Sequence, residues 1–266
     1  TGTYTLTYTV SDAAGNEANA TRIVRVVDHL LELNSTVSLE MIWVEAGTFT
    51  MGQVGVAEPE HEVTLTNGFY LGKYEVTQAQ YEAVMTGNTD GLNTKPSYWP
   101  NNPNRPVEQV SWQDIQVFLT RLNAQQAGNI PAGWAYVLPT EAQWEYACRA
   151  GTTTAYSWGD TITSGNANYL SSGYSQTRDV GLYSANPWGF LDMHGNVVEW
   201  TADWHGNYSN GAQTDPEGST TFSTLVVRGG SWGWSGTESL SAWRGIYHPP
   251  TRTNSIGFRV GFRQVQ

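Results

Sequence analysis

The chain has little cysteine and little charge. Cys148 is the only cysteine among 266 residues, which excludes an intramolecular disulfide and a cysteine-based zinc cluster. Lys and Arg number 13 against 24 Asp and Glu, and a net charge of −11 argues against nucleic acid or anionic membrane as a partner. No apolar run approaches the roughly 18 residues of a membrane-spanning helix, so no membrane insertion is expected. No signal peptide and no internal repeat are visible.

Glycine and tryptophan are abundant instead, at 28 and 12 residues, and apolar residues make up 39% of the chain. This composition indicates a folded, loop-rich protein, and the length suffices for one large domain or two smaller ones. Beyond Gly151 no segment keeps a helical period. Loops of that length in a compact domain are usually functional.

The first 27 residues predict a β-hairpin. "TYTLTYTV" alternates polar with apolar residues, "SDAAGN" is a turn, and "NATRIVRVV" is the return strand. Two strands alone are marginally stable, so we expect further strands from a longer chain or from another chain. The stretch resembles the last hairpin of the immunoglobulin-like repeats strung along bacterial surface proteins.

That resemblance implies a division of the chain into three parts. Residues 1–28 are expected to end an immunoglobulin-like repeat, 29–40 to form a connector, and 41–266 to form the main domain. The connector could pack as an extra strand or as a turn of helix. The resemblance further implies additional repeats in the parent chain and an extracellular or cell-surface location in a bacterium.

Three segments predict helices with defined starts. Each begins at a Ser or Thr, and a side chain three residues later can complete a capping box, as noted for the segments at Ser111 and Thr140. The segments are 75–85, starting at Thr77; 111–126, with Ser111 and Asp114; and 140–151, with Thr140 and Gln143 and an end at Gly151.

Seven ordered stretches resemble the formylglycine-generating enzyme family, also known as the sulfatase-modifying-factor domain. They are "WVEAGTFTMG" (43–52), "LGKYEVTQAQYEAV" (71–84), "RPVEQVSWQDIQVF" (105–118), "LPTEAQWEYACRAGT" (138–152), "NPWGFLDMHGNVVEWTADW" (186–204), "RGGSW" (228–232) and "IGFRV" (256–260). The resemblance spans residues 41–264. It implies an α+β, loop-rich variant of the C-type-lectin-like fold.

The resemblance also locates the family's chemistry. The family's oxidase uses two cysteines shortly after "GGS" to bind copper and activate oxygen, and a thiolate pair suits Cu(I). Aligned on "GGSW", those positions hold Trp234 and Ser239, and neither is a thiolate. Cys148 lies in a helix segment and is expected to be a core residue. No copper is therefore expected, and the chain is interpreted as a non-catalytic member.

Other chemistries of the superfamily find less support. The sulfoxide synthases carry an iron-binding histidine set on an added helical domain, which this sequence lacks. The five histidines are scattered, without metal-ligand spacing, at positions 29, 61, 194, 205 and 248. A protein-modifying enzyme with non-copper chemistry stays open as an alternative.

The family resemblance further implies structural calcium, because hard oxygen ligands suit Ca²⁺. One predicted site uses side-chain oxygens of Asp192 and Glu199 with the carbonyls of Gly195 and Val197. A second, less complete site would involve Asn168 and Tyr169. The alternative interpretation is a pair of carboxylates bonded to loop amides.

Residues 233–255 are expected to form the exposed face over the family's substrate pocket, and we call this the loop face. Its predicted binding residues are Trp234, Trp243, Tyr247, His248, Thr251, Arg252, Thr253 and Asn254. Aromatic rings with small polar side chains are typical of recognition surfaces, although Trp243 and Trp234 could equally be core residues. The ligand class stays open between protein and carbohydrate.

Two further hypotheses concern the loop face and the hairpin. The irregular stretch fits the diversified region of the variable proteins of diversity-generating retroelements, which lies between the counterparts of "RGGSW" and "IGFR". The incomplete hairpin is compatible with a self-assembling surface protein, because a neighbouring subunit could complete its sheet.

Overall fold

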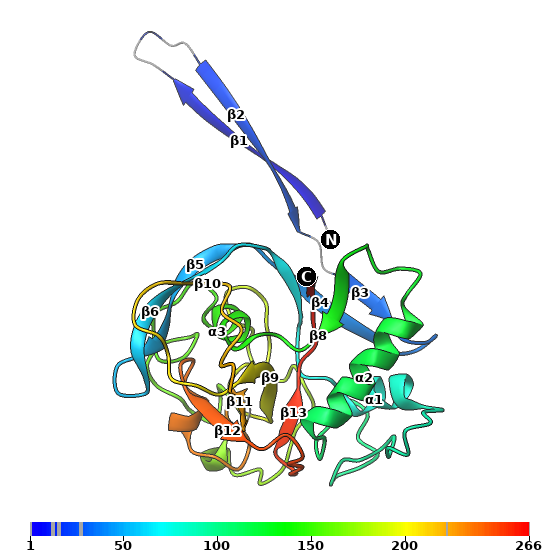
Figure 1. Cartoon of the computed structure of the whole chain (residues 1–266). Coiled ribbons are helices and arrows are strands. Elements are labelled where there is room, and N and C mark those ends of the chain that lie inside the picture. Colours follow the sequence, from blue (N-terminus) through cyan, green and yellow to red (C-terminus); the bar gives the residue numbers. More distant parts are fainter. Residues whose placement is uncertain (1, 12–13, 15–16, 27–28, 222, 266) are drawn as a thin grey trace.

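The computed structural model describes residues 2–11, 14, 17–26, 29–221 and 223–265. The predicted hairpin consists of β1 (Gly2–Ser11) and β2 (Glu17–Val26), which pair antiparallel with Gly2 opposite Val26. The "SDAAGN" turn lies largely outside the described residues. Figure 1 shows the hairpin projecting from the main body of the protein.

The main body contains three sheets. The first is antiparallel, in the order β3 (His29–Glu32), β4 (Ser38–Val44), β7 (Phe69–Gly72), β14 (Gly261–Gln264), β8 (Trp134–Val137). The second has the order β10 (Gln213–Thr214), β6 (Ala57–Leu65), β5 (Gly47–Gln53). The third has the order β12 (Arg244–Tyr247), β11 (Leu225–Arg228), β9 (Val198–Trp204), β13 (Ile256–Phe258), with β13 parallel to β9.

The segment expected to be a connector joins the first sheet. Its residues 29–32 form β3, which pairs antiparallel with β4 from His29 opposite Met41 to Glu32 opposite Ser38. Of the two alternatives, an extra strand or a helical turn, the structure contains the strand.

The three helices are α1 (Gln78–Met85), α2 (Trp112–Gln125) and α3 (Glu141–Arg149). Reciprocal capping boxes start all three, at Thr77 with Gln80, Ser111 with Asp114, and Thr140 with Gln143. All three helices begin one residue after the predicted starts Thr77, Ser111 and Thr140, which are their N-cap residues. The residue that ends α3 in a left-handed conformation is Ala150, one position before the predicted Gly151.

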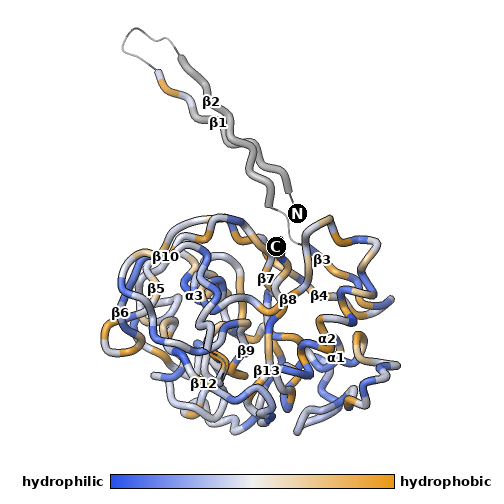
Figure 2. Tube along the Cα trace, viewed as in Figure 1, coloured by the Kyte–Doolittle hydropathy of each residue, from blue (hydrophilic) through white to orange (hydrophobic). Residues whose placement is uncertain are grey.

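The described residues after α3 contain no α-helix, only 3-10 turns at Leu170–Ser172 and Gly236–Ser239. This confirms the predicted loop-rich second half. Figure 2 shows apolar and polar residues intermixed along most elements. Within the described part of the chain no helix combines the length and apolarity needed to cross a membrane.

Two apolar cores hold the elements together. The larger lies between α1, α2 and the inner faces of the first and third sheets, and it buries Trp200 and Phe258 completely. The smaller surrounds α3 and contains the fully buried Trp144. Large aromatic side chains thus supply core area where regular elements are few.

The two faces of the third sheet differ in character, and this positions the sites described below. Along β9, Val198, Trp200 and Trp204 pack on the larger core, whereas Glu199, Thr201 and Asp203 point to the opposite side, towards α3. This follows from the alternation of side chains along a strand. Arg228 of β11 and Arg244 of β12 also lie on the α3 side, where both contact Glu141.

Candidate functional site

The last loop of the domain is the segment 229–255 between β11 and β13; it contains the short strand β12 and carries the loop face. It opens at Gly229 and Gly230, whose φ angles are 96° and 71°, in the region that favours glycine. A Cβ on Gly230 would stand 2.4 Å from Ser239 Oγ, so only glycine lets the chain fold back this closely. Arg228 then anchors the return segment, because its Nη1 donates to the carbonyls of Ala242 and Trp243.

Trp234, at the position of the family's first cysteine, is half-buried among other rings. Its ring centre lies 5.2 Å from that of Trp243, edge to face, and 6.3 Å from that of Tyr247, stacked. Tyr247 in turn meets the buried Trp200 edge to face at 6.1 Å. The three predicted aromatic residues of the loop face therefore lie together, half in the core and half at the surface.

Ser239, at the position of the second cysteine, is fully buried. Its carbonyl oxygen accepts from His194 Nδ1 at 2.7 Å, and its hydroxyl has no hydrogen-bond partner among the described residues. A side chain in this place cannot reach a substrate at the surface without rearrangement of the loop.

Cys148, the remaining sulfur, is also fully buried, in α3. Its Sγ lies 3.5 Å from Nε2 of His194. Burial raises the thiol pKa to about 12, so the side chain stays protonated at neutral pH. Burial lowers the pKa of His194 to about 4, so the imidazole stays neutral and offers no charge to stabilise a thiolate. The pair is structural, as expected for Cys148.

The polar residues of the loop face follow the aromatic group along the chain. His248 is exposed, and its Nδ1 lies 3.2 Å from the carbonyl of Ser223. Thr251 is half-buried beside it, and its amide donates to the carbonyl of His248 at 2.9 Å. The carbonyls of Thr253 and Asn254 accept from Gln109 and Trp232, so this backbone is fixed while the side chains stay partly exposed.

Arg252 is exposed but already paired. Its Nε and Nη2 bond both carboxylate oxygens of Asp114, at 2.7 and 2.6 Å. Burial raises the pKa of Asp114, but the bonds from Arg252 and Ser111 outweigh that effect and hold it below its usual value. Arg252 therefore joins the loop face to the start of α2, and only part of its guanidinium remains for a ligand.

Aromatic residues that were not predicted extend the loop face. Tyr98 is 62% exposed and meets Trp99 edge to face at 5.0 Å, and Trp99 meets Trp232 at 5.4 Å. The buried Glu108 holds this pair, because its carboxylate accepts from the amides of Tyr98 and Trp99 at 3.0 and 3.4 Å. The sequence does contain the aromatic pair, in "PSYWP" (96–100). The residues around it do not indicate that it packs beside Trp232, which lies far along the chain.

The predicted calcium ligand Glu199 has other partners. Arg259 donates to both of its oxygens, from Nη2 at 2.8 Å and from Nε at 3.0 Å, and Trp144 Nε1 donates at 2.8 Å. A guanidinium on both oxygens leaves no lone pair directed at a cation and repels one. In this arrangement the residues do not fit the ion.

The other predicted ligands surround the same buried cluster. Asp192 Oδ2 accepts from the amide of Gly181 at 2.6 Å, and burial raises the pKa of Asp192 to about 6. The amide of Val197 donates to the fully buried Glu75 at 2.9 Å. Gly195 has φ 92°, and a Cβ there would stand 2.4 Å from the carbonyl oxygen of Asn168.

The second predicted site has no cluster of acidic groups. Asn168 donates to the carbonyl of Gln176 at 2.9 Å and accepts from Ser172 Oγ at 2.9 Å, and Tyr169 is buried. Across the described ranges, no group of three or more His, Cys, Asp or Glu is arranged to hold a metal ion. Calcium thus stays a prediction that a direct measurement must decide.

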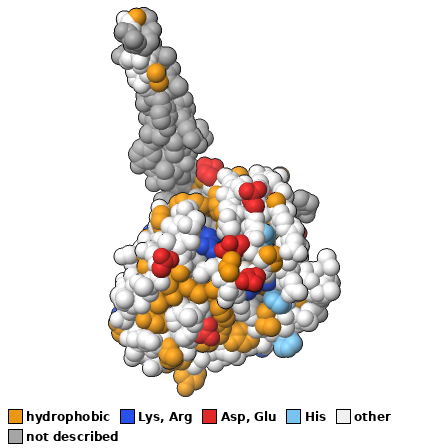
Figure 3. Space-filling view, turned by 90° about the vertical axis from the view of Figure 1, so that its left-hand side faces the viewer, with side chains coloured by type: hydrophobic (Ala, Val, Ile, Leu, Met, Phe, Trp, Pro, Cys, Tyr) orange, Lys and Arg blue, Asp and Glu red, His pale blue; other side chains and the backbone are white. Residues whose placement is uncertain are grey.

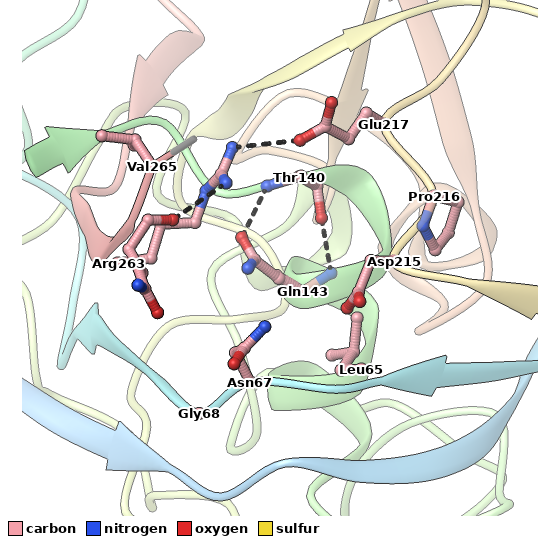
Figure 4. A pocket seen from close by; sticks show the side chains of 11 residues that line it. Leu65, Asn67, Gly68, Thr140, Gln143, Asp215, Pro216, Glu217, Arg263 and Val265 are labelled. Carbon is pink, nitrogen blue, oxygen red and sulfur yellow. Dashed lines mark hydrogen bonds and ion pairs between the residues drawn. The ribbon is translucent and has the colours of Figure 1, made fainter. Parts of the chain in front are cut away.

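Two cavities lie away from the loop face, around β6, β10 and α3. The larger has a volume of about 570 Å³, and Figure 4 shows Arg263 and Glu217 on one of its walls. Arg263 Nη2 lies 3.7 Å from Glu217 Oε1. Asp215 lines it too, with its carboxylate bonded to the amide and hydroxyl of Thr66. The smaller, of about 340 Å³, opens beside Asp203. None of the predicted site residues lines either cavity.

The fold and the position of the last loop define a formylglycine-generating-enzyme-type domain of the C-type-lectin-like class. Residues 30–263 match the sulfatase-modifying factor enzyme 1-like domain, and the chain belongs to this family. The predicted family and fold class are thereby confirmed.

The chain is similar in sequence to proteins with different names. The chain is 28% identical to the "Chaperone protein LppX" of Paenibacillus barcinonensis, over 88% of this chain and 91% of that protein. It is 29% identical to the formylglycine-generating enzyme of Streptomyces coelicolor, over 70% of this chain and 66% of that enzyme.

Solved structures show the same fold. Treponema denticola variable protein 1 superposes with a TM-score of 0.76 at 26% identity, over 88% of this chain and 98% of that one. PvdO from Pseudomonas aeruginosa superposes with a TM-score of 0.75 at 27% identity, also over 88% of this chain and 98% of that one.

Proposed function

We propose that the chain is a non-catalytic binding module whose site is the loop face. One observation carries this proposal: the two positions that hold the family's copper-binding cysteines are occupied by Trp234 and Ser239, the first packed among rings and the second fully buried. Cys148, the one remaining thiol, is buried and protonated at neutral pH.

The composition of the loop face supports recognition. Trp234 and Tyr247 offer rigid area that loses little conformational entropy on binding, and His248 and Thr251 offer hydrogen-bonding groups. Tyr98 and Trp99 widen the aromatic part of the surface. A protein or a carbohydrate is the ligand class that such a surface suits, and neither nucleic acid nor membrane insertion is part of the proposal.

Genetic diversification of residues 233–255 is a further part of this proposal. The similarity to a structure named a variable protein supports it. The test is to sequence the DNA beside the gene for a near-identical template repeat and a reverse transcriptase. Their absence would remove diversification from the account and leave the binding function standing.

The location proposed is outside a bacterial cell, on a stalk of immunoglobulin-like repeats. The support is the two-stranded hairpin of β1 and β2, which pair only with each other among the described strands. Protease treatment of intact cells that express the parent protein tests the location. Size measurement of the present chain tests the alternative of self-assembly, for which we expect a monomer.

Binding is tested by applying the labelled chain to arrays of glycans and of bacterial and host surface proteins. We expect a restricted set of ligands, and we expect His248→Ala and Tyr98→Ala to weaken each of them. Both side chains are exposed, so neither substitution should affect folding. Leu30→Ala is the matched control, because Leu30 is 58% exposed on β3, in a different sheet.

The competing enzymatic function predicts a different result. A modifying enzyme would bind metal stoichiometrically and oxidise a cysteine-containing peptide with consumption of oxygen. We expect neither from this chain, since its single thiol, that of Cys148, is buried and the described residues contain no group of three or more His, Cys, Asp or Glu arranged to hold a metal ion. Turnover of the peptide would overturn the proposed function.

A further inference from the structure

The smaller cavity lies on the side of the third sheet opposite the aromatic residues of the loop face. We call it the β9 pocket; it is formed by His61, Glu141, Asp203, Tyr208, Arg244 and the segment 206–220. Its volume of about 340 Å³ falls within the roughly 300–1,000 Å³ typical of small-molecule sites. Arg244 belongs to β12, but its side chain points to α3, whereas Tyr247 packs on Trp200.

The charged groups of the β9 pocket are already neutralised within the protein. Arg244 bonds both oxygens of Glu141, from Nε at 2.8 Å and from Nη2 at 2.6 Å. Tyr208 donates its hydroxyl to the same carboxylate at 3.0 Å, and Arg244 Nη1 donates to the carbonyl of Gly206 at 2.8 Å. A charged ligand would find no free counter-charge in this pair.

Two buried side chains in the wall each keep one polar atom without a partner. Asp203 is 3% exposed; its Oδ2 accepts from the amide of Glu141 at 2.8 Å, and no described residue bonds its Oδ1. His61 is 7% exposed; its Nδ1 lies 2.9 Å from the carbonyl of Pro59, and no described residue bonds its Nε2. Neither atom is among the fully buried polar atoms without a partner, so both are accessible from the cavity that their residues line, where a ligand or water can bond them.

The polarity of these atoms follows from their neighbours. A carbonyl only accepts, so His61 donates from Nδ1, and in that tautomer Nε2 is an acceptor. Burial raises the pKa of Asp203 to about 8, with Glu141 and Glu217 adding to the rise and Arg244 opposing it. Asp203 is therefore protonated at neutral pH, and since Oδ2 accepts, Oδ1 carries the proton and donates.

The remaining wall is uncharged and combines polar side chains with the apolar Met51, Ala142 and Pro216. The segment 206–220 contributes side chains with amide and hydroxyl groups, namely Asn207, Ser209, Gln213, Ser219 and Thr220. Figure 3 shows the side of the molecule that carries β5, β6 and β10, where most of the surface is uncharged and carboxylates are scattered. Hydroxyl groups, which both donate and accept, match a wall that holds one donor and one acceptor.

We propose that the β9 pocket binds a neutral polyhydroxylated ligand of about the size of a hexose unit. Its hydroxyls accept from Asp203 Oδ1 and donate to His61 Nε2, and the side chains of segment 206–220 bond the rest of the ring. The site is separate from the loop face, so it does not depend on the function proposed above.

The test titrates free hexoses and their methyl glycosides into the chain and follows binding by NMR, with glucuronate and glucosamine as charged counterparts. We expect at least one neutral sugar to bind, and the charged analogues to bind at least tenfold more weakly. Ser209→Trp places a large side chain in the pocket from an exposed position and should abolish binding. Ser164→Trp, at an exposed position outside the pocket, is the matched control.

Asp203→Asn supplies a second, pH-based readout. Asparagine can still accept from the amide of Glu141 and donate into the pocket, and it does so at every pH. We expect wild-type affinity to fall roughly tenfold from pH 7 to pH 9, as Asp203 loses its proton, and the variant's affinity to stay constant. The groups that face Asp203 are Glu141, Glu217 and Arg244, and all three remain in the variant.

Several results would overturn this inference: no binding of any neutral sugar, equal or tighter binding of the charged analogues, binding unchanged by Ser209→Trp, or an equal pH response in the Asn variant. None of these results bears on the loop face, because the array experiment tests variants at other positions, His248 and Tyr98.

Discussion

At the scale of single residues, buried ion pairs fix the loops of this domain. Arg259 is fully buried and donates to Glu199 and to the carbonyls of Gly72 and Leu191. It thereby connects the first sheet, the third sheet and the loop that precedes β9. A charge with this many partners is costly to remove, because each partner is left without its donor.

Arg259→Met tests this role. The substitution leaves Glu199 buried without its cation, and we expect a loss of about 3–5 kcal/mol in the free energy of unfolding, measured by urea denaturation. Lys95→Met is the control, since Lys95 pairs with Glu82 at the surface, where such pairs contribute at most about 1 kcal/mol. Equal effects of the two substitutions would contradict the assigned role.

Glu108 makes stability depend on pH. Burial raises its pKa to about 7, above the ordinary value of 4.5, although hydrogen bonds from the amides of Tyr98 and Trp99 oppose the rise. Between these two values the folded protein binds more protons than the unfolded chain, so this group's contribution to stability falls as pH rises from 4.5 to 7.

Glu108→Gln isolates that contribution from those of other buried acids. Glutamine can still accept from the two amides but does not titrate. We expect the difference in unfolding free energy between variant and wild type to grow in the variant's favour from pH 4.5 to pH 7. A difference that does not change across this range would show that Glu108 titrates normally.

At the scale of elements, the glycine turn at the start of the last loop is the most constrained feature. Gly230→Ala would place a Cβ 2.4 Å from Ser239 Oγ and 2.8 Å from the carbonyl oxygen of Glu238, at a φ of 71°. We expect a loss of about 1–3 kcal/mol in unfolding free energy and weaker ligand binding at the loop face. Gly128→Ala, where a Cβ meets nothing within 4 Å and φ is not positive, should leave both unchanged.

Local elements could be predicted from the sequence because local chemistry decides them. The capping boxes at Ser111 and Thr140 depend on residues three positions apart, and the structure contains both. The loop face around Trp234 was located differently, through the resemblance of "GGSW" and "IGFR" to the family's motifs. Only the capping boxes were predicted from local chemistry alone.

Contacts between distant segments could not be predicted in the same way. Arg259 lies 60 positions after Glu199 and forms an ion pair with its carboxylate, which was expected to bind calcium. Tyr98 and Trp99 join the loop face through Trp232, far along the chain. The β9 pocket combines residues from β6, α3, β9 and β12. Such assemblies appear only once the sheets are formed.

At the scale of the whole molecule, the family resemblance implies a calcium site, whereas the observed contacts of Glu199 leave no place for the ion. Because Arg259 occupies both oxygens of Glu199, we expect calcium and EDTA to give the same midpoint of thermal unfolding. A calcium-dependent rise that disappears in Asp192→Asn would restore the calcium assignment.

The central claim is that the loop face binds a ligand without transforming it. With a ligand selected from the arrays, amide hydrogen exchange and mass spectrometry on one sample test both parts. We predict new protection within residues 233–255 and 97–99, none in β3 and β4, and recovery of the ligand with its mass unchanged. Protection confined to other segments, or a ligand recovered with altered mass, would contradict the account.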